Sequence, residues 1–196
     1  MDMLNFIKSR RSTRKYLACP VEPEKTAMII EAGTYAPSGG NNQSWHFTVI
    51  EDRAVLTRLA ELAEAAFAKM TYDENTYSSL VGSIRASQRG GYVFHYHAPV
   101  LIIVGNRRGY GNAMADSACA MENMMLMANA LDLGSCWINQ LHWLDEDETI
   151  RDCLAGYGIG PDETICASLA VGYPDTEDGL PNRTPGPRKE IRIDCI

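Results

Sequence analysis

The sequence predicts an α+β fold in which helices sandwich a mixed sheet. Two helical segments come first, and strand-like segments then alternate with helices. No G-x-G-x-x-G motif follows the first strand and no Walker loop occurs, so the signatures of the Rossmann and P-loop folds are missing. The 196 residues suffice for one domain with a sizeable core and are few for two. We therefore expect a single domain over residues 1–196.

Two helices are predicted before the first strand. Residues 3–10 form a short helix with Leu4 and Ile7 on one face. The next helix begins at Pro23, because proline followed by an acidic residue suits a first helical turn, and it ends before Pro37. The segment that follows residue 10 therefore starts at the carboxyl end of the first helix.

A strand, a regular helix and an irregular segment come next. Aromatic and β-branched residues at 45–51 predict a strand. Residues 54–70 repeat apolar side chains at helical spacing and predict an amphipathic helix. Residues 71–91 lose that periodicity and are rich in Ser, Tyr and Asn. We expect a mobile cover with short helical pieces there, within a variable segment that spans 71–97.

The second half of the chain contains the predicted core. The continuous apolar run at 98–105 is typical of a strand buried on both faces. Residues 112–131 form a helix that is apolar nearly all round, which suits the centre of a structure or a dimer interface. Its methionines suggest core packing more than a flavin-contacting box. Strands at 135–139 and 164–173 enclose a short helix at 145–154.

The end of the chain is a predicted arm. From residue 174 the sequence is rich in Pro and Gly, so residues 174–196 should run along a surface. Ile191 and Ile193 are candidates for a last edge strand.

Composition narrows the class of protein. The formal net charge of −7 argues against nucleic acid as a partner. No window has the roughly 18 uninterrupted apolar residues of a membrane helix, and no basic leader precedes an apolar run. The six cysteines form no C-x-x-C pair and no zinc-like spacing. We expect free thiols in a cytoplasmic protein.

A tight basic cluster interrupts this acidic chain. The stretch S-R-R-S-T-R-K-Y at 9–16 holds four basic side chains and two hydroxyls, namely Arg10, Arg11, Arg14, Lys15, Ser12 and Thr13. We call these six residues the N-terminal basic cluster. Because a guanidinium gives parallel charge-assisted hydrogen bonds, the cluster suits one or two phosphate oxygens. The alternative is a solvated basic loop after a short helix.

The histidines offer a weaker site. His95 and His97 would lie on one side of a strand as a possible metal pair. No carboxylate or cysteine follows at a fitting spacing, so we expect no metal. His46 and His142 are expected to be packed or surface residues.

Several segments together resemble the FMN-dependent nitroreductase family. They are R-R-S-T-R-K-Y at 10–16, A-P-S-G-G-N-N-Q-S-W-H-F at 36–47, A-P-V-L-I-I-V at 98–104, G-S-C-W-I at 134–138, and V-G-Y-P followed by P-R-K at 187–189. The resemblance covers nearly the full length. It implies a nitroreductase-like three-layer sandwich, with a mixed, mainly antiparallel sheet flanked by helices. It also implies an intertwined homodimer that holds two FMN molecules between its subunits.

The resemblance implies FMN contacts from both ends of the chain. Arg10 and Ser12 would lie near the phosphate or ribityl chain, and Arg14 near the flavin ring. Arg11 matches a position that often gives another polar contact. The basic pair that closes over the phosphate would be Arg188 and Lys189.

The middle of the chain supplies two further sets of implied contacts. The partner subunit would contribute a polar loop, through Pro37, Ser38, Gly39, Asn41 and Gln43. The third strand would place backbone against the flavin, at Trp137, Ile138 and Asn139.

The implied activity is ping-pong, two-electron reduction of nitroaromatics, quinones or similar electrophiles by NAD(P)H. Since the cofactor carries the chemistry, we name no catalytic side chain. Arg14 is the candidate for stabilising negative charge at flavin N1 and O2. Two alternatives remain: the same fold with flavin-fragmenting, dehalogenating or enone-reducing activity, or a non-catalytic flavin-storing or sensing protein. The segment 71–97, as the expected cover of the flavin face, would decide between the enzymes.

Overall fold

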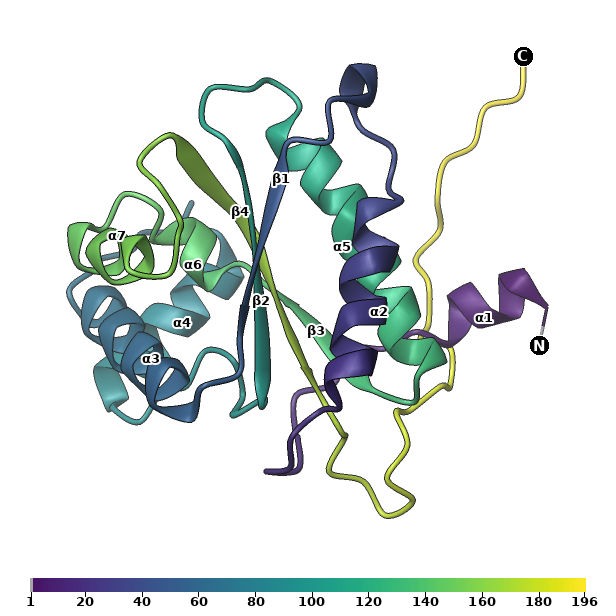
Figure 1. The fold of residues 1–196 in the computed structure, drawn as a ribbon, viewed down its shortest axis with the longest axis horizontal. Helices are drawn as coiled ribbons and strands as arrows, with labels where there is room; N and C mark the ends of the chain where they lie inside the picture. The colour runs from purple at the N-terminus through teal and green to yellow at the C-terminus, as the bar shows by residue number, and fades with distance from the viewer. Residues whose placement is uncertain (1) are drawn as a thin grey trace.

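A four-stranded antiparallel sheet forms the middle layer of the protein (Figure 1). The computed structural model describes residues 2–196. The strands are β1 (Trp45–Ile50), β2 (Val100–Arg107), β3 (Gly134–Ile138) and β4 (Glu163–Gly172), in the spatial order β1-β2-β4-β3. Parallel pairing among the described residues is limited to an isolated bridge between Ser12 and Ser135. Every residue of β2 except Arg107 is buried, as the apolar run predicts for a strand covered on both faces.

Helices cover both faces of this sheet (Figure 1). One face carries α3 (Arg53–Ala68), α4 (Ser78–Arg89), α6 (Gln140–Trp143) and α7 (Glu148–Ala155). The other face carries α2 (Pro23–Thr34) and α5 (Ala113–Ala130), with α1 (Met3–Ser9) beyond them. A hydrophobic core fills the space on each side of the sheet. These three layers confirm the predicted α+β sandwich, although the sheet is antiparallel in all its strand pairs where a mixed sheet was expected.

Local sequence explains where several helices begin. Asp2, Asp52 and Asp147 are the N-caps of α1, α3 and α7, and each side chain accepts a backbone N–H of the first turn. Pro23 stands in the first turn of α2, as predicted. The predicted starts of α1 to α3 are therefore confirmed to within a residue.

The methionine-rich helix α5 is a core helix. Met121, Met124 and Met125 are buried between the sheet and α2. Gly33 allows the two helices to approach, because a Cβ there would lie 3.0 Å from Cγ of Met124. The interpretation of these methionines as core packing is confirmed.

On the face of the sheet covered by α3 and α7, two predictions need correction and one helix was not expected. Residues 71–91 contain one regular twelve-residue helix, α4, in place of short helical pieces. Only Leu80 and Ile84 of this helix join the core that also contains α3, and this sparse apolar pattern hides the helical periodicity. The helix α6 was not predicted, and α7 begins three residues later than the expected helix at 145–154.

Two further predictions are wrong. Ile191 and Ile193 form no edge strand within the described chain and are 71% and 77% exposed. His95 and His97 do not lie on a strand, because β2 begins only at Val100 and both residues belong to the turn before it. Apolar or alternating residues define a strand only where a neighbouring strand is available for pairing.

Among residues 2–196, no helix combines the length and the apolar character needed to cross a bilayer. All six cysteines are free thiols.

Candidate functional site

The N-terminal basic cluster is attached to the edge of β3. The backbone N–H of Thr13 donates to the carbonyl of Ser135 at 2.9 Å, and that of Leu17 donates to the carbonyl of Tyr173 at 2.9 Å. Gly134 makes this contact possible, since a Cβ there would lie 2.6 Å from the side chain of Thr13. The segment that follows α1 is therefore held along the sheet rather than free in solvent.

The three arginines of the cluster have different surroundings. Arg10 is partly buried and lies 3.8 Å from the carboxylate of Glu122, at the limit of an ion pair. Arg11 donates to the carbonyl of Thr184 at 2.7 Å. The guanidinium of Arg14 lies 5.9 Å from the ring centre of Tyr96. Ser12 is exposed beside them. This part of the predicted site is thus brought together, with Arg10 and Arg14 not saturated by protein partners.

The predicted β3 residues adjoin the cluster. Trp137 is partly buried and its indole N–H donates to the side-chain oxygen of Asn139. Ile138 is 2% exposed, so it can offer a ligand only its backbone. Burial raises the pKa of the Cys136 thiol, against the opposite influence of Arg14 and Ser12, so this thiol is packed and unreactive.

The C-terminal arm crosses the same region. Arg183 donates to the carbonyl of Asn129 and to the carboxylate of Asp132, both at 2.6 Å. Asn129 lies in the last turn of α5, where carbonyls lack helical partners, so this clamp also caps the helix. Together with the bond from Arg11 to Thr184, it brings the head and the arm side by side. Arg188 and Lys189, a few residues on, are exposed and make no ion pair or side-chain hydrogen bond with described residues.

The polar loop before β1 is fixed to the opposite end of α5. Gly39 donates its N–H to the carboxylate of Asp116 at 3.0 Å, and its carbonyl accepts from the hydroxyl of Tyr110 at 3.2 Å. The same hydroxyl donates to Asp116 at 3.0 Å. A Cβ on Gly39 would collide with the side-chain amide of Asn112. A larger residue at this position would have to displace Asn112 and the hydroxyl of Tyr110 that holds the loop.

The loop backbone takes conformations that its residues tolerate. Gly40, Asn41 and Gln43 have φ of 60°, 56° and 47° around the short 3-10 helix Gly39–Asn41. Glycine and asparagine enter this left-handed region most readily. Ser38 steadies the loop by accepting the N–H of Gln43 at 3.0 Å, while Pro37 is exposed.

Within a single chain, the polar loop before β1 and the N-terminal basic cluster lie far apart. The loop is tied to Asp116, and the region of the basic cluster is tied to Asn129 through its bond to Ser9. Thirteen residues of helix separate these anchors, which corresponds to about 20 Å. Figure 1 shows the helical turn before β1 at the top of the view and the chain after α1 in its lower half.

The segment 71–97 contacts α6, which follows β3, and the N-terminal basic cluster. Gln140, the first residue of α6, donates to the hydroxyl of Tyr92 at 2.8 Å and to that of Ser83 at 3.2 Å. Tyr96 lies beside Arg14, in a turn where Tyr96 and His97 have φ of 56° and 58°. The segment is therefore linked to both α6 and the basic cluster.

Sequence reasoning missed the residues that position the site. Asp116 and Tyr110 fix the loop, Gly134 allows the edge contact and Arg183 anchors the arm. An arginine in the Pro-rich arm and an acid on an apolar helix were the available signals. Arg183 and Asp116 pair with Asp132 and Gly39, which are more than fifty residues away in the sequence. No local pattern therefore identifies these pairs. Within the described chain, no group of three or more His, Cys, Asp or Glu side chains is placed to hold a metal ion.

Comparison with known proteins identifies the family of the chain. The chain matches the family model described as Nitroreductase family over residues 7–173. A crystal structure of a nitroreductase with bound FMN from Bacteroides fragilis NCTC 9343 is 33% identical, with a TM-score of 0.81, over 99% of this chain and 95% of that chain.

Two curated relatives differ in their named activities. A protein of Archaeoglobus fulgidus, provisionally named as an NADH dehydrogenase/NAD(P)H nitroreductase, is 28% identical over 90% of this chain and 87% of its own length. An iodotyrosine deiodinase of Hydra vulgaris is 25% identical over 98% of this chain and 72% of its own length. Because the family model spans most of the described fold, the chain belongs to the nitroreductase family.

Proposed function

We propose that this protein is an FMN-dependent NAD(P)H oxidoreductase that reduces nitroaromatics, quinones or similar electrophiles by a ping-pong, two-electron mechanism. The observation that carries the proposal is the N-terminal basic cluster, held against the edge of β3 with Arg10 and Arg14 free to meet an anion. Similarity to a nitroreductase with bound FMN supports the choice of cofactor.

The donor set of the cluster fits a phosphate group. Arg10 and Ser12 present a guanidinium and an exposed hydroxyl on one short segment, next to the backbone of β3. The arm is clamped beside the cluster by Arg183, and Arg188 and Lys189 follow this clamp by a few residues, so they would join the same anion site. An acidic chain that gathers cations from both termini has the charge pattern of a specific anion site.

Arg14 suits the ring portion of the cofactor. When bound, FMN takes up two electrons from a nicotinamide and delivers them to an acceptor. Arg14 would hold a fixed positive charge beside the N1–O2 edge, where negative charge accumulates, and the ring of Tyr96 limits the directions in which its guanidinium can turn. The backbone of Trp137 to Asn139 would support the ring, and no side chain is required to act as a nucleophile.

A homodimer would unite the two halves of the site. The loop of Ser38 to Gln43 lies about 20 Å along α5 from the basic cluster of its own chain, so a second copy must bring its loop to complete the pocket. An unpaired apolar surface supports such an assembly. Large apolar side chains on α1 and α2 are exposed, namely Met3 at 72%, Leu4 at 60%, Ile7 at 46%, Met28 at 43%, and Tyr35, just after α2, at 79%.

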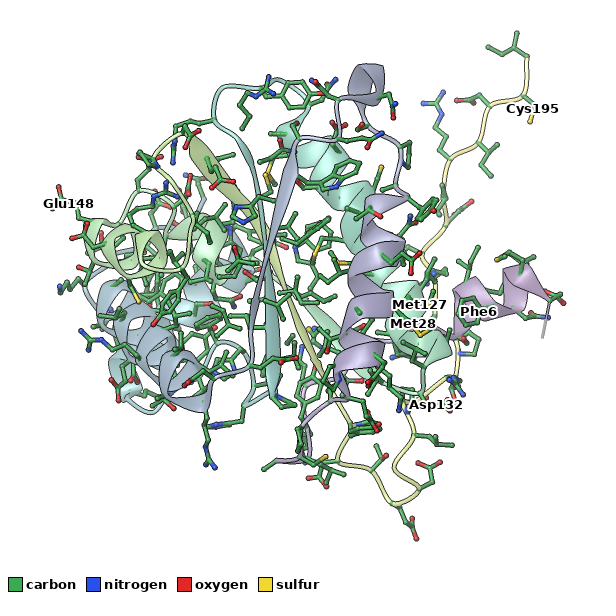
Figure 2. The ribbon with its side chains drawn as sticks, viewed as in Figure 1. Phe6, Met28, Met127, Asp132, Glu148 and Cys195 are labelled. Atoms are coloured by element: carbon green, nitrogen blue, oxygen red, sulfur yellow. The ribbon has the colours of Figure 1, made fainter. Side chains whose placement is uncertain are left out.

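Figure 2 shows where this surface lies. Phe6, Met28 and Met127 gather where α1 meets α2 and α5, and they line an open groove there. Homodimer interfaces are richer in apolar and methionine side chains than other surfaces. We therefore place the subunit contact on α1, α2 and α5.

Reductive dehalogenation is the second candidate activity. The similarity to iodotyrosine deiodinase over nearly the whole chain favours it. The two activities share the cofactor and fold and differ in the groups that contact the acceptor, so Asn139, Gln140 and the segment 71–97 carry the distinction.

The decisive experiment reconstitutes the full-length chain with FMN. We expect one FMN per chain in a particle with twice the mass of the 21.7 kDa chain by light scattering. We also expect anaerobic bleaching by NADH or NADPH, and reoxidation by nitrobenzene faster than by 4-iodophenol. Faster reoxidation by 4-iodophenol would favour the second candidate. Failure to bind FMN would overturn both, and FMN that neither nicotinamide reduces would indicate a flavin-storing protein.

A further inference from the structure

The polar loop before β1 has a defined backbone although it packs little against its own chain. Pro37 and residues 40–43 are exposed, and none of them joins either hydrophobic core. Asn41 and Gln43 nevertheless have positive φ, as does Gly40 between them and Gly39. Such a backbone is unfavourable for residues other than glycine and persists only where surrounding contacts enforce it. The enforcing contacts must come from outside the loop.

Two side chains supply these contacts. Asp116, in the first turn of α5, is 5% exposed and accepts the N–H of Gly39 through Oδ1 at 3.0 Å. The hydroxyl of Tyr110 lies 3.0 Å from Oδ2 of Asp116 and 3.2 Å from the carbonyl oxygen of Gly39. Among the described residues, all hydrogen bonds that connect residues 37–43 to the rest of the fold involve this pair.

The anchor is a buried carboxylate without a counter-ion. No ion pair of the described chain includes Asp116. Removing a carboxylate from water is costly, and here the positive end of α5 and the two hydrogen bonds offset the cost. The two oxygens serve two donors, so they fix both the position and the tilt of the loop at Gly39. The buried charge thus places an exposed loop.

The loop is held far from the basic cluster of its own chain, about 20 Å along α5. We propose that Asp116 and Tyr110 are positioning residues that act across the dimer, by holding the loop at Gly39 in the conformation that meets FMN in the other subunit's site. This inference rests on the proposed function and adds the residues that set the loop. Because Asp116 is buried, it acts through Gly39 and does not touch the cofactor.

The chemistry of the anchor provides a matched pair of substitutions. Asp116→Ala removes both acceptors and releases Gly39. Asp116→Asn keeps one acceptor for the N–H of Gly39, and its amide can donate to the hydroxyl of Tyr110, which then donates to the carbonyl of Gly39. Asp116→Asn therefore tests whether the hydrogen bonds, rather than the charge, hold the loop.

Fluorescence titration with FMN measures the consequence for the cofactor. Asp116→Ala should weaken FMN binding about 10-fold or more, because a released loop must be ordered when FMN binds. Asp116→Asn should stay within about three-fold of the unaltered protein. The matched control is Asp147→Ala, which removes the N-cap of α7 on the opposite face of the sheet. It should lower stability and leave FMN affinity unchanged.

A mixed dimer shows whether the loop acts across the interface. One subunit carries Arg10→Ala and the other carries Asp116→Ala, and two affinity tags isolate the mixed species. If the loop acts on the other subunit, both defects fall in one site, so the mixed dimer binds one FMN with native affinity. If the loop acts within its own chain, each site has one defect and neither is native. The two homodimers give the reference affinities.

Hydrogen exchange tests the anchor without FMN. The amide of Gly39 should exchange about 10-fold or more faster in Asp116→Ala than in Asp116→Asn, and equal rates would refute the anchoring. If Asp116→Ala does not fold, Tyr110→Phe, which removes one hydroxyl, replaces it in the mixed dimer.

Failure of the inference is distinguishable from failure of the proposed function. Normal FMN affinity in Asp116→Ala, or a mixed dimer without a native site, would overturn the inference and leave the proposed function standing. Failure of the unaltered protein to bind FMN would overturn the proposed function and the inference with it.

Discussion

Replacing Gly134 by alanine tests how the N-terminal basic cluster is held. The new Cβ would lie 2.6 Å from Cγ2 and Oγ1 of Thr13 and 2.7 Å from its Cβ. Rotation about χ1 moves Cγ2 and Oγ1, but Cβ is fixed to the backbone that forms the hydrogen bond to Ser135, so its clash cannot be relieved by rotation. The segment must move off the edge of β3, and Arg10 and Arg14 must move with it.

The size of the effect follows from three contributions. Overpacking of this kind costs about 1–3 kcal/mol. Loss of the hydrogen bond from Thr13 to Ser135 adds about 1 kcal/mol. Removing a glycine from the unfolded chain returns about 0.7 kcal/mol. The free energy of unfolding should therefore fall by about 1.5–3 kcal/mol, and FMN affinity should fall with it if the cluster binds the phosphate.

Urea unfolding and fluorescence titration with FMN measure the two consequences separately. Gly82→Ala is the matched control, because no heavy atom lies within 4 Å of the new Cβ, and there the helix should gain about 0.5–1 kcal/mol. Thr13→Gly in the Gly134→Ala background removes the clashing atoms and should recover FMN affinity. Unchanged stability and affinity in Gly134→Ala would refute the proposed attachment. Lost stability with normal FMN affinity would keep the packing argument and remove the cluster from the flavin site.

Three other changes probe separate parts of the protein. Arg10→Ala should weaken FMN binding about 10- to 100-fold, because a hydrogen bond to a charged group contributes about 1.5–3 kcal/mol. The control Lys8→Ala removes an exposed charge and should leave the FMN affinity nearly unchanged. Fluorescence titration with FMN measures both affinities. Asp145→Asn should lower the free energy of unfolding by about 3–5 kcal/mol, because the buried carboxylate accepts hydrogen bonds from two arginines, a hydroxyl and a backbone N–H. A loss below about 1 kcal/mol in urea unfolding would contradict the stabilising role of this carboxylate. Since burial and then His97 lower the pKa of His95 from 6.5 to about 4, the unfolded chain binds a proton that the folded chain does not, and stability should fall as the pH drops from 6.5 toward 4. The free energy of unfolding should fall by about 2 kcal/mol near pH 5, and this loss should be absent in His95→Leu. Urea unfolding of both proteins as a function of pH measures it, and parallel profiles would contradict the prediction.

Periodic and chemically distinctive segments were predictable from the sequence. The strands β1, β2 and β4 and the helices α2, α3 and α5 carry their own patterns of apolar spacing, proline and acidic caps. The basic cluster at 10–15 and the glycine loop at 37–44 were visible as residue types. The helix α4 was not, because few of its residues are apolar and its stability comes from packing on α3.

By itself, the sequence determined the order of helices and strands, the gathering of cations near residue 12 and the family resemblance. The tertiary structure decided what those residues meet. It tied Gly39 to Asp116 and the arm to Asn129, placed the two halves of the site at opposite ends of α5, and left His95 buried without a partner. Helical spacing and turn residues act over a few positions, whereas these contacts join segments more than fifty residues apart. Such pairings exist only once both cores have packed against the sheet, so no local pattern could contain them.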